Sequence, residues 1–360
     1  MTRVGSAVAA LLSAGVRGTG AAAELAEADQ LLRTALPLSR RVGCVAAAGG
    51  SGTSTTAAAL ANVLAARRAG MVLAVDAAGG ASGLTWLAGA SAETGEPVSG
   101  QPMSGQPASG QPAAGQAASA QAAAQRRRTA RTAAEARTGL PSSGSGAAVL
   151  DLTRGDGRAA PVAAWGRDVA PVSRFFDLVV TDWGVRPAPE ELAEVAATSH
   201  VVLVVSRADR HSADAAAALV PQLRAAASPP QVLLVLVDVG RTADRLAPAT
   251  RPGPEVVTVG HQPARAAAVP PGSRELGARA RRDQILLAAR VVAAAVRPAT
   301  PVALALALAP APADPPAGTR PAPDREPSST AAPADAAVRL PVAPLSAAPY
   351  AGARARGVDA

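Results

Sequence analysis

The sequence contains one cysteine, Cys44, and no lysine among its 360 residues. A single cysteine cannot form an intramolecular disulfide framework or a cysteine-based zinc site. The three histidines, His200, His211 and His261, lie far apart in the sequence, so we expect no histidine-rich metal centre. Aromatic residues make up 2% of the chain. No run of about 18 apolar residues is present, so we expect no membrane-spanning helix.

Because lysine is absent, all 35 basic residues are arginines, and the formal net charge is +8. The abundance of Ala, Gly, Pro and Arg is typical of a GC-rich genome, so composition reports mutational bias as much as function. The positive charge would suit nucleic acid, phospholipid or an acidic protein as a partner. The densest cluster, Arg126–Arg128 with Arg131, contains no aromatic residue that could stack on bases. We expect it to be a solvated, disordered arginine run.

The composition changes along the chain and divides it into parts. Residues 4–16 are rich in Ala and Gly rather than Leu, so we expect an N-terminal extension instead of a secretion signal, and a cytoplasmic protein. A low-complexity sequence, such as the segment with a five-residue repeat at 99–113, cannot bury enough apolar surface to offset the entropy lost when the chain becomes ordered. The expected parts are an N-terminal extension (1–36) with a helix at 21–36, a main domain (37–297) with a disordered low-complexity insertion (91–146), and a disordered Pro/Ala-rich tail (298–360).

Short apolar runs, mostly of Val and Leu without polar alternation, are typical of strands buried on both faces of a parallel sheet. They are residues 42–46, 71–75, 149–152, 178–181, 201–205, 232–237 and 256–259. Helical segments are predicted at 54–68, 188–197, 213–226 and 274–296, the last an amphipathic helix that we expect to pack on the domain rather than on a membrane. This alternation predicts an α/β protein with a mostly parallel sheet in three layers, either doubly wound or of the P-loop NTPase type.

A glycine-rich turn follows the first predicted strand, where residues 46–56 read Ala-Ala-Ala-Gly-Gly-Ser-Gly-Thr-Ser-Thr-Thr. Backbone N–H groups of such a turn, together with the positive end of the next helix, hold phosphate groups. The predicted phosphate-binding residues are Gly49, Gly50, Ser51, Gly52, Thr53, Ser54 and Thr55. Two acids accompany the turn, because the next strand ends at Asp76 and a later one contains Asp182.

These motifs resemble those of the MinD/ParA family of P-loop ATPases, in particular the actinobacterial branch associated with type VII (ESX) secretion genes. The family loop, Lys-Gly-Gly-x-Gly-Lys-Thr-Thr, aligns without a gap with Ala48–Thr55. The segment Leu73–Leu87 resembles the second strand of that branch, Asp177–Gly184 its Walker B strand, and Val256–Pro263 its last strand and nucleotide-base loop. The resemblance covers residues 24–90 and 147–297.

The resemblance implies weakly bound ATP and Mg²⁺ as cofactors. It places Ser54 and Asp182 at the magnesium ion, Asp76 beside it and His261 at the adenine; alternatively, Asp182 caps the following turn. Both family lysines are missing, since the phosphate lysine falls on Thr53 and the signature lysine, which reaches the partner's nucleotide across a dimer, falls on Ala48.

The second acid of the family's Asp-x-Asp motif, which positions water, falls on Ala78. Loss of one charge aimed at the transition state costs about 10²–10³ in rate. We therefore expect a degenerate ATPase that acts as a regulatory or scaffolding partner in type VII secretion or cell-pole organisation. Its protein partner would be an intact relative or a secretion component. The alternatives are a slow ATPase, in which Arg207, Arg210 or Arg241 supplies charge, and a nonspecific nucleic-acid-binding protein.

Overall fold

A computed structural model describes residues 20–36, 38–80, 83–90, 114–153, 158–240, 254–263 and 276–297. All of them belong to one compact unit, Met1–Ala309, whereas the second unit, Pro310–Ala360, lies outside the described residues. Within the described ranges, no helix combines the length and the apolar character needed to cross a bilayer.

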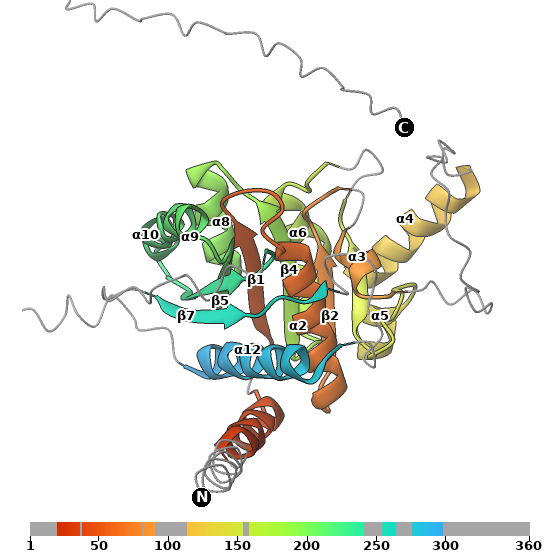
Figure 1. Cartoon of the computed structure of the whole chain (residues 1–360). Coiled ribbons are helices and arrows are strands. Elements are labelled where there is room, and N and C mark those ends of the chain that lie inside the picture. The colour runs from red at the N-terminus through yellow and green to blue at the C-terminus, as the bar shows by residue number, and fades with distance from the viewer. Residues whose placement is uncertain are drawn as a thin grey trace, which may run out of the picture. The chain divides into compact units, whose positions relative to one another are not determined.

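The unit is built on a seven-stranded sheet in the order β3-β2-β4-β1-β5-β6-β7 (Figure 1). Every neighbouring pair of strands is parallel. The strands are β1 (Arg40–Ala46), β2 (Val72–Asp76), β3 (Ala148–Asp151), β4 (Leu178–Val185), β5 (Val201–Arg207), β6 (Gln231–Val237) and β7 (Glu255–Val259). Each of the seven apolar runs forms a strand, so the predicted parallel sheet is confirmed.

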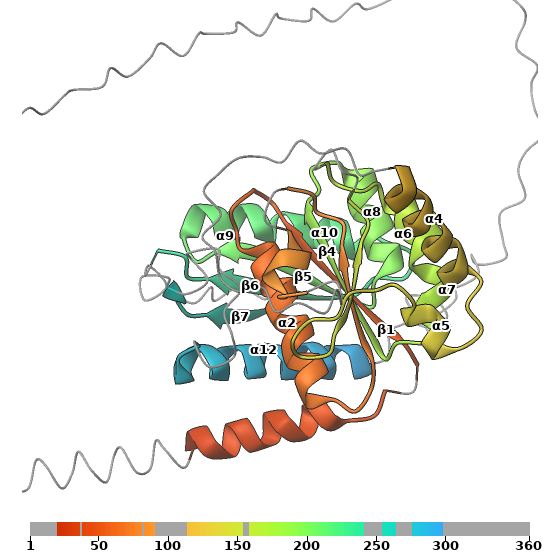
Figure 2. The ribbon, with the colours of Figure 1, turned by 90° about the vertical axis from the view of Figure 1, so that its right-hand side faces the viewer.

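Helices cover both faces of the sheet, which gives the predicted three layers (Figure 2). One face carries α2 (Thr53–Arg67), α3 (Leu84–Leu87) and α12 (Ala278–Val296); the other carries α5 (Ala133–Arg137), α6 (Val162–Asp168), α7 (Ala170–Ser173), α8 (Pro189–Thr198), α9 (Arg210–Ala217) and α10 (Leu219–Arg224). Strand β2 shows how one strand serves both cores: Val72 and Ala74 face α2 and α12, while Leu73 and Val75 face the opposite layer. Burial on both faces explains why the strand sequences do not alternate.

Residues 20–33 form a helical segment that packs on the same face as α2 and α12. Ala28 and Leu32 are buried in the core of that face. Charged pairs hold the segment from both sides, since Asp29 accepts from Arg67 of α2 at 2.6 Å and Glu24 pairs with Arg282 of α12. The helix that was expected within an N-terminal extension therefore contributes to the core of the main unit, and it ends at residue 33 rather than 36.

The structure differs from the sequence-based prediction in the second half of the insertion. Residues 114–146 were expected to be disordered, but α4 (Ala114–Arg128) and α5 form there and place Ala130 and Ala136 in the core. Thr132 caps α5 by accepting the backbone N–H of Glu135, whose carboxylate accepts the N–H of Arg131. This reciprocal capping and the helix preference of alanine stabilise helices in a low-complexity segment that has no apolar periodicity. For residues 91–113 and 298–360, which lie outside the described residues, disorder stays a prediction.

Other differences concern helices. Helices α6 and α7 lack a long apolar repeat and were not predicted. The single helix expected at 213–226 is divided into α9 and α10 at Ala218. Helix α12 packs against the sheet as expected, because Leu287, Val291 and Val292 are buried on its inner side.

The arginine run was expected to be solvated and disordered, but Arg126–Arg128 belong to α4 and Arg127 is buried. Arg127 is 9% exposed and donates from Nη1 to the Thr138 carbonyl oxygen at 3.3 Å, whereas its neighbour Arg126 is exposed. We expect Arg127→Ala to lower the free energy of unfolding by about 1–3 kcal/mol, because it removes packing and a charge-assisted hydrogen bond. Arg126→Ala, the matched control, should change it by less than about 0.5 kcal/mol. Equal urea midpoints for the two variants would contradict the packing of α4 described above.

Candidate functional site

The glycine loop, residues 47–52, connects the end of β1 to the start of α2. Gly50 and Gly52 have φ angles of 71° and 84°, a left-handed conformation that side chains disfavour. The loop is closed by the Ser51 hydroxyl, which donates to the Ala48 carbonyl oxygen at 2.7 Å. Gly52 is the N-cap of α2, and no side chain of the described residues caps this helix. The first N–H groups of α2 and the positive end of its dipole are therefore available to an anion.

The structure places the three positions at which the sequence resemblance expects charged side chains, Ala48, Thr53 and Ala78. Ala48 is exposed at the start of the loop. Thr53 is the first residue of α2 and is 7% exposed. Ala78 lies against Gly184 of β4, where a Cβ atom on the glycine would approach the alanine methyl group to 2.8 Å. None of the three side chains carries a charge, so the loop itself has no cation.

Asp182 of β4 lies beside the start of α2 and is 0% exposed. Its Oδ1 accepts the backbone N–H of Gly184 at 3.0 Å, so the turn-capping alternative is part of its role. Oδ2 is buried and has no partner with hydrogen-bond geometry among the described residues. Burial raises the pKa of this carboxyl to about 7, and the charge of Asp76 adds to the rise, whereas the nearby Ser54 hydroxyl lowers it. A buried oxygen in this state indicates that a cation or a proton belongs there.

Asp76 is the neighbour of Asp182 across the sheet, where the two Cα atoms pair in register. Both of its carboxylate oxygens are used locally: Oδ1 accepts from the Ala78 N–H at 3.3 Å and Oδ2 from the Thr85 N–H at 3.2 Å. Burial raises its pKa despite these hydrogen bonds. The geometry shows a side chain that anchors the start of α3 and adds negative charge beside Asp182.

An arginine from the far half of the sequence reaches the glycine loop. Arg207, the last residue of β5, donates from Nε to the Gly50 carbonyl oxygen at 3.1 Å. The guanidinium lies close to the loop backbone, since a Cβ atom at position 50 would be 2.7 Å from Nη2 and the end of the arginine side chain would have to shift. Of the other two candidate cations, Arg210 points to Asp214 at 3.8 Å, and Arg241 lies outside the described residues.

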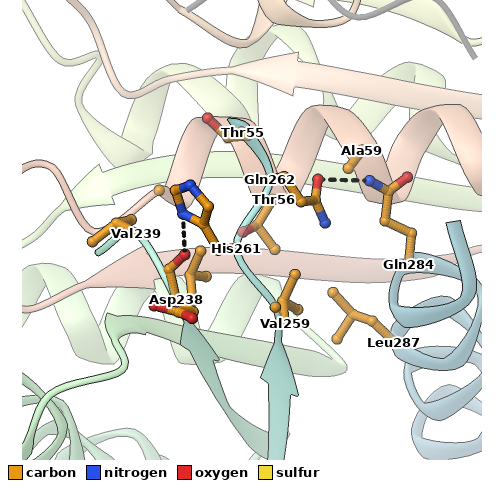
Figure 3. Close-up of a pocket in the computed structure, with 13 residues that line it drawn as sticks. Thr55, Thr56, Ala59, Asp238, Val239, Val259, His261, Gln262, Gln284 and Leu287 are labelled. Carbon is orange, nitrogen blue, oxygen red and sulfur yellow. Dashed lines mark hydrogen bonds between the residues drawn. The ribbon is translucent and has the colours of Figure 1, made fainter. Parts of the chain in front are cut away.

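A pocket of about 310 Å³ opens next to the glycine loop, between α2, the ends of β6 and β7, and α12 (Figure 3). Its wall is mainly apolar, with a few polar groups at the strand ends. The lining residues are Gly52, Thr55, Thr56, Ala59, Val237, Asp238, Val239, Val259, Gly260, His261, Gln262, Gln284 and Leu287. His261 lines the pocket, with its Nδ1 3.1 Å from the Asp238 carbonyl oxygen. A mainly apolar pocket with a few convergent polar groups is typical of a small-molecule site.

The sequence interpretation missed two polar residues in this pocket. Gln284 of α12 donates from Nε2 to Oε1 of Gln262 at 3.1 Å, and the two side chains are 6% and 8% exposed. The sequence feature that could have identified Gln284 is a glutamine among the apolar residues on the buried side of α12. Its partner is 22 residues away, and only the packing of α12 against the end of β7 brings the pair together.

The cysteine, the other two histidines and two tryptophans lie elsewhere. Cys44 is a 0% exposed core residue whose thiol pKa is raised by burial. The Nδ1 of His200 accepts the Arg41 N–H at 3.1 Å, and burial lowers its pKa to about 4. Trp183 is a core residue at 1% exposure, whereas Trp86 is 58% exposed. His211 is exposed.

The donor set suits a magnesium ion better than a transition metal. Among the described residues, no group of three or more His, Cys, Asp or Glu side chains could hold a metal ion alone. Mg²⁺ commonly takes one or two protein oxygens and completes its shell with water and phosphate oxygens. The unpartnered Oδ2 of Asp182 and the adjacent Ser54 hydroxyl fit that requirement.

No protein-family model matches the chain, and no curated protein matches its sequence. Several solved structures are similar to it. The cell division ATPase MinD of Pyrococcus furiosus is 15% identical, with 71% of this chain and 99% of that chain covered and a TM-score of 0.47. A ParA family ATPase from Chlorobium tepidum is 14% identical, with 72% and 95% covered and a TM-score of 0.43. A putative plasmid partition protein from Borrelia burgdorferi, bound to AMPPNP, is 12% identical, with 70% and 98% covered and a TM-score of 0.43. Similarity at this distance assigns neither a ligand nor an activity, which must be argued from the residues of this chain.

Proposed function

We propose that this chain binds a nucleoside triphosphate with Mg²⁺ at the glycine loop and does not hydrolyse it at a significant rate. The observation that carries the proposal is the combination at the start of α2. The uncapped helix, the left-handed glycines and the buried, unpartnered Oδ2 of Asp182 are present, while Ala48 and Thr53 stand where the resemblance places lysines. A site of this kind can hold phosphate through backbone N–H groups and still lack the charges that phosphoryl transfer needs.

Different residues would contact the phosphates, the Mg²⁺ ion and the base of the nucleotide. Backbone N–H groups of Gly49, Gly50, Ser51, Gly52, Thr53, Ser54 and Thr55 would receive the phosphates. When bound, Mg²⁺ would neutralise phosphate charge, held by Ser54 and Asp182, while Asp76 positions the neighbouring loop. The base would enter the adjacent pocket, where His261 and the pair formed by Gln262 and Gln284 offer polar contacts and Ala59, Val259 and Leu287 offer apolar ones.

A bound state without turnover suits a protein that signals by its conformation or by assembly. We therefore propose a regulatory or scaffolding role with a protein partner, either an intact relative or a secretion component. The connection to type VII secretion or cell-pole organisation, and the cytoplasmic location, rest on the resemblance of the sequence motifs. The nucleic-acid alternative would use the exposed arginines, such as Arg126 and Arg131, since Arg127 of the same cluster is packed inside the unit.

The test is a calorimetric titration of the full chain with ATP in the presence of Mg²⁺, followed by a phosphate-release assay on the same sample. We expect saturable binding in the micromolar to millimolar range and no release above a protein-free control. Ser54→Ala should weaken the magnesium-dependent part of the affinity. Turnover that Ser54→Ala abolishes would instead establish the slow ATPase, the alternative that the position of Arg207 on the loop favours. Absence of any binding would refute both.

The same reasoning predicts that ATP does not change the oligomeric state. In the family that the motifs resemble, each signature lysine contacts the nucleotide of the other subunit, and Ala48 cannot do this. ATP then makes no differential contact that would favour a dimer. Light-scattering mass should be the same with and without ATP and Mg²⁺ at low micromolar protein. A doubling that reverses when Mg²⁺ is removed would count against the inactive scaffold.

A further inference from the structure

We propose that Arg207 replaces the missing loop lysine, by placing its guanidinium against the phosphate chain of a nucleoside di- or triphosphate. The inference rests on the proposed function, because it names the side chain that makes a lysine-free loop able to hold such a ligand. It concerns binding of the phosphates and includes no chemical step.

The first argument is position. Arg207 ends β5, which is the direct neighbour of β1 in the sheet, so both strands deliver their following residues to the same edge. From there its Nε donates to the carbonyl oxygen of Gly50 at 3.1 Å, although the two residues are 157 positions apart in the sequence. The contact fixes the guanidinium on the loop at the second of its three glycines. A carbonyl contact of this kind orients the side chain before any ligand arrives, which reduces the entropy lost on binding.

The second argument is unused hydrogen-bonding capacity. A guanidinium has five N–H donors, and Nε is the one donor of Arg207 with a hydrogen-bond partner among the described residues. Asp209, two residues further along the chain, has its pKa lowered chiefly by the N–H and hydroxyl of Ser212 and only to a lesser degree by Arg207. The positive charge is thus exposed beside a set of backbone N–H groups and is not neutralised by a close ion pair.

The third argument is elimination among the cations near this edge of the sheet. Arg186 is 3% exposed, and its N–H groups bond the carbonyl oxygens of Trp183, Ala77 and Ala160 and the carboxylate of Glu191. The side chain of Arg210 is 93% exposed and pairs with Asp214 on its own helix. Of these three arginines, Arg207 is the one that contacts the glycine loop.

The guanidinium of Arg207 also lies close to the loop backbone at position 50. A Cβ atom there would lie 2.7 Å from Nη2, so a side chain at this position would displace the end of the arginine. The left-handed φ angle of 71° is the feature that favours glycine at this position. The planar guanidinium comes from outside the loop and needs no space within it.

The experiment compares calorimetric affinities of the full-length wild type, Arg207→Gln, Arg207→Lys and the matched control Arg210→Gln for ATP, ADP and AMP with Mg²⁺ at low salt. Both glutamine variants remove one positive charge, three residues apart. We expect Arg207→Gln to weaken ATP and ADP by about 10- to 100-fold, the effect of losing one charge-assisted contact, and AMP by less than about 2-fold. Arg207→Lys should retain part of the affinity, and Arg210→Gln all of it within about 2-fold.

Each outcome decides a different claim. If the wild type binds ATP and the two glutamine variants bind it equally, Arg207 has no role in phosphate binding, while the proposed function stands. Weakening that is the same for AMP and ATP would show a structural effect of the substitution and overturn the assignment as well. If the wild type binds none of the nucleotides, the proposed function itself fails. Unchanged melting temperatures of all variants confirm that each is folded.

Discussion

Thr53→Lys is expected to tighten the binding of ATP and ADP by about 10- to 100-fold and to leave hydrolysis at background. Thr53 is the first residue of α2, so a lysine there would bring an ammonium group to the phosphates that the helix start receives. One charge-assisted hydrogen bond at such a site contributes about 1.5–3 kcal/mol. Turnover should not follow, because Ala48 and Ala78 still lack the other charged groups.

The control for this gain is Thr53→Gln, which has a similar length and no charge. It separates the new charge from the effect of a longer side chain at a position that is 7% exposed. Calorimetry on both variants gives the difference. An equal affinity for lysine and glutamine variants would show that the loop does not place the charge near the ligand. Hydrolysis restored by Thr53→Lys alone would show that the other departures matter little.

Asp182→Asn is expected to stabilise the ligand-free protein above pH 7 by about 2–4 kcal/mol. The wild-type carboxyl has its pKa raised to about 7, chiefly by burial, from an ordinary value of 3.8. Between about pH 4 and pH 7, the folded chain therefore holds a proton on Asp182 that the unfolded chain has released. Stability from this group is therefore complete below about pH 4 and is lost as the pH rises through about 7. Asparagine can still accept the Gly184 N–H and never acquires the buried charge.

Urea unfolding at pH 5 and pH 8 tests whether the stability contributed by Asp182 falls as the pH rises. The advantage of Asp182→Asn should be largest at pH 8 and should shrink toward pH 5, as the wild-type carboxyl becomes protonated. Asp214→Asn, on the exposed face of α9, is the control and should show no such trend. Asp182→Asn should also weaken magnesium-dependent nucleotide binding, because the buried charge that destabilises the empty site is the charge that a bound cation needs. A variant that is no more stable than wild type at pH 8 would contradict the raised pKa.

Much of this molecule was determined locally by the sequence. Runs of Val and Leu with no polar alternation can only be buried on both faces, so they predicted all seven parallel strands before any contact was known. Gly50 and Gly52 between a strand and a helix predicted the loop, because a tight turn of this kind needs left-handed residues. The sequence also shows directly that Ala48, Thr53 and Ala78 carry no charge.

Only the tertiary structure decided which distant residues complete the site. Arg207 reaches Gly50 because β5 and β1 are neighbours in the sheet, and no sequence pattern states that adjacency. The raised pKa of Asp182 likewise depends on burial and on the register that sets it opposite Asp76. Helices α4 and α5 form from alanine-rich text that has no apolar stripe of its own. Alanine preference and the capping at Thr132 favour helix locally, and packing of Ala130 and Ala136 against the rest of the unit adds stability that depends on both partner segments.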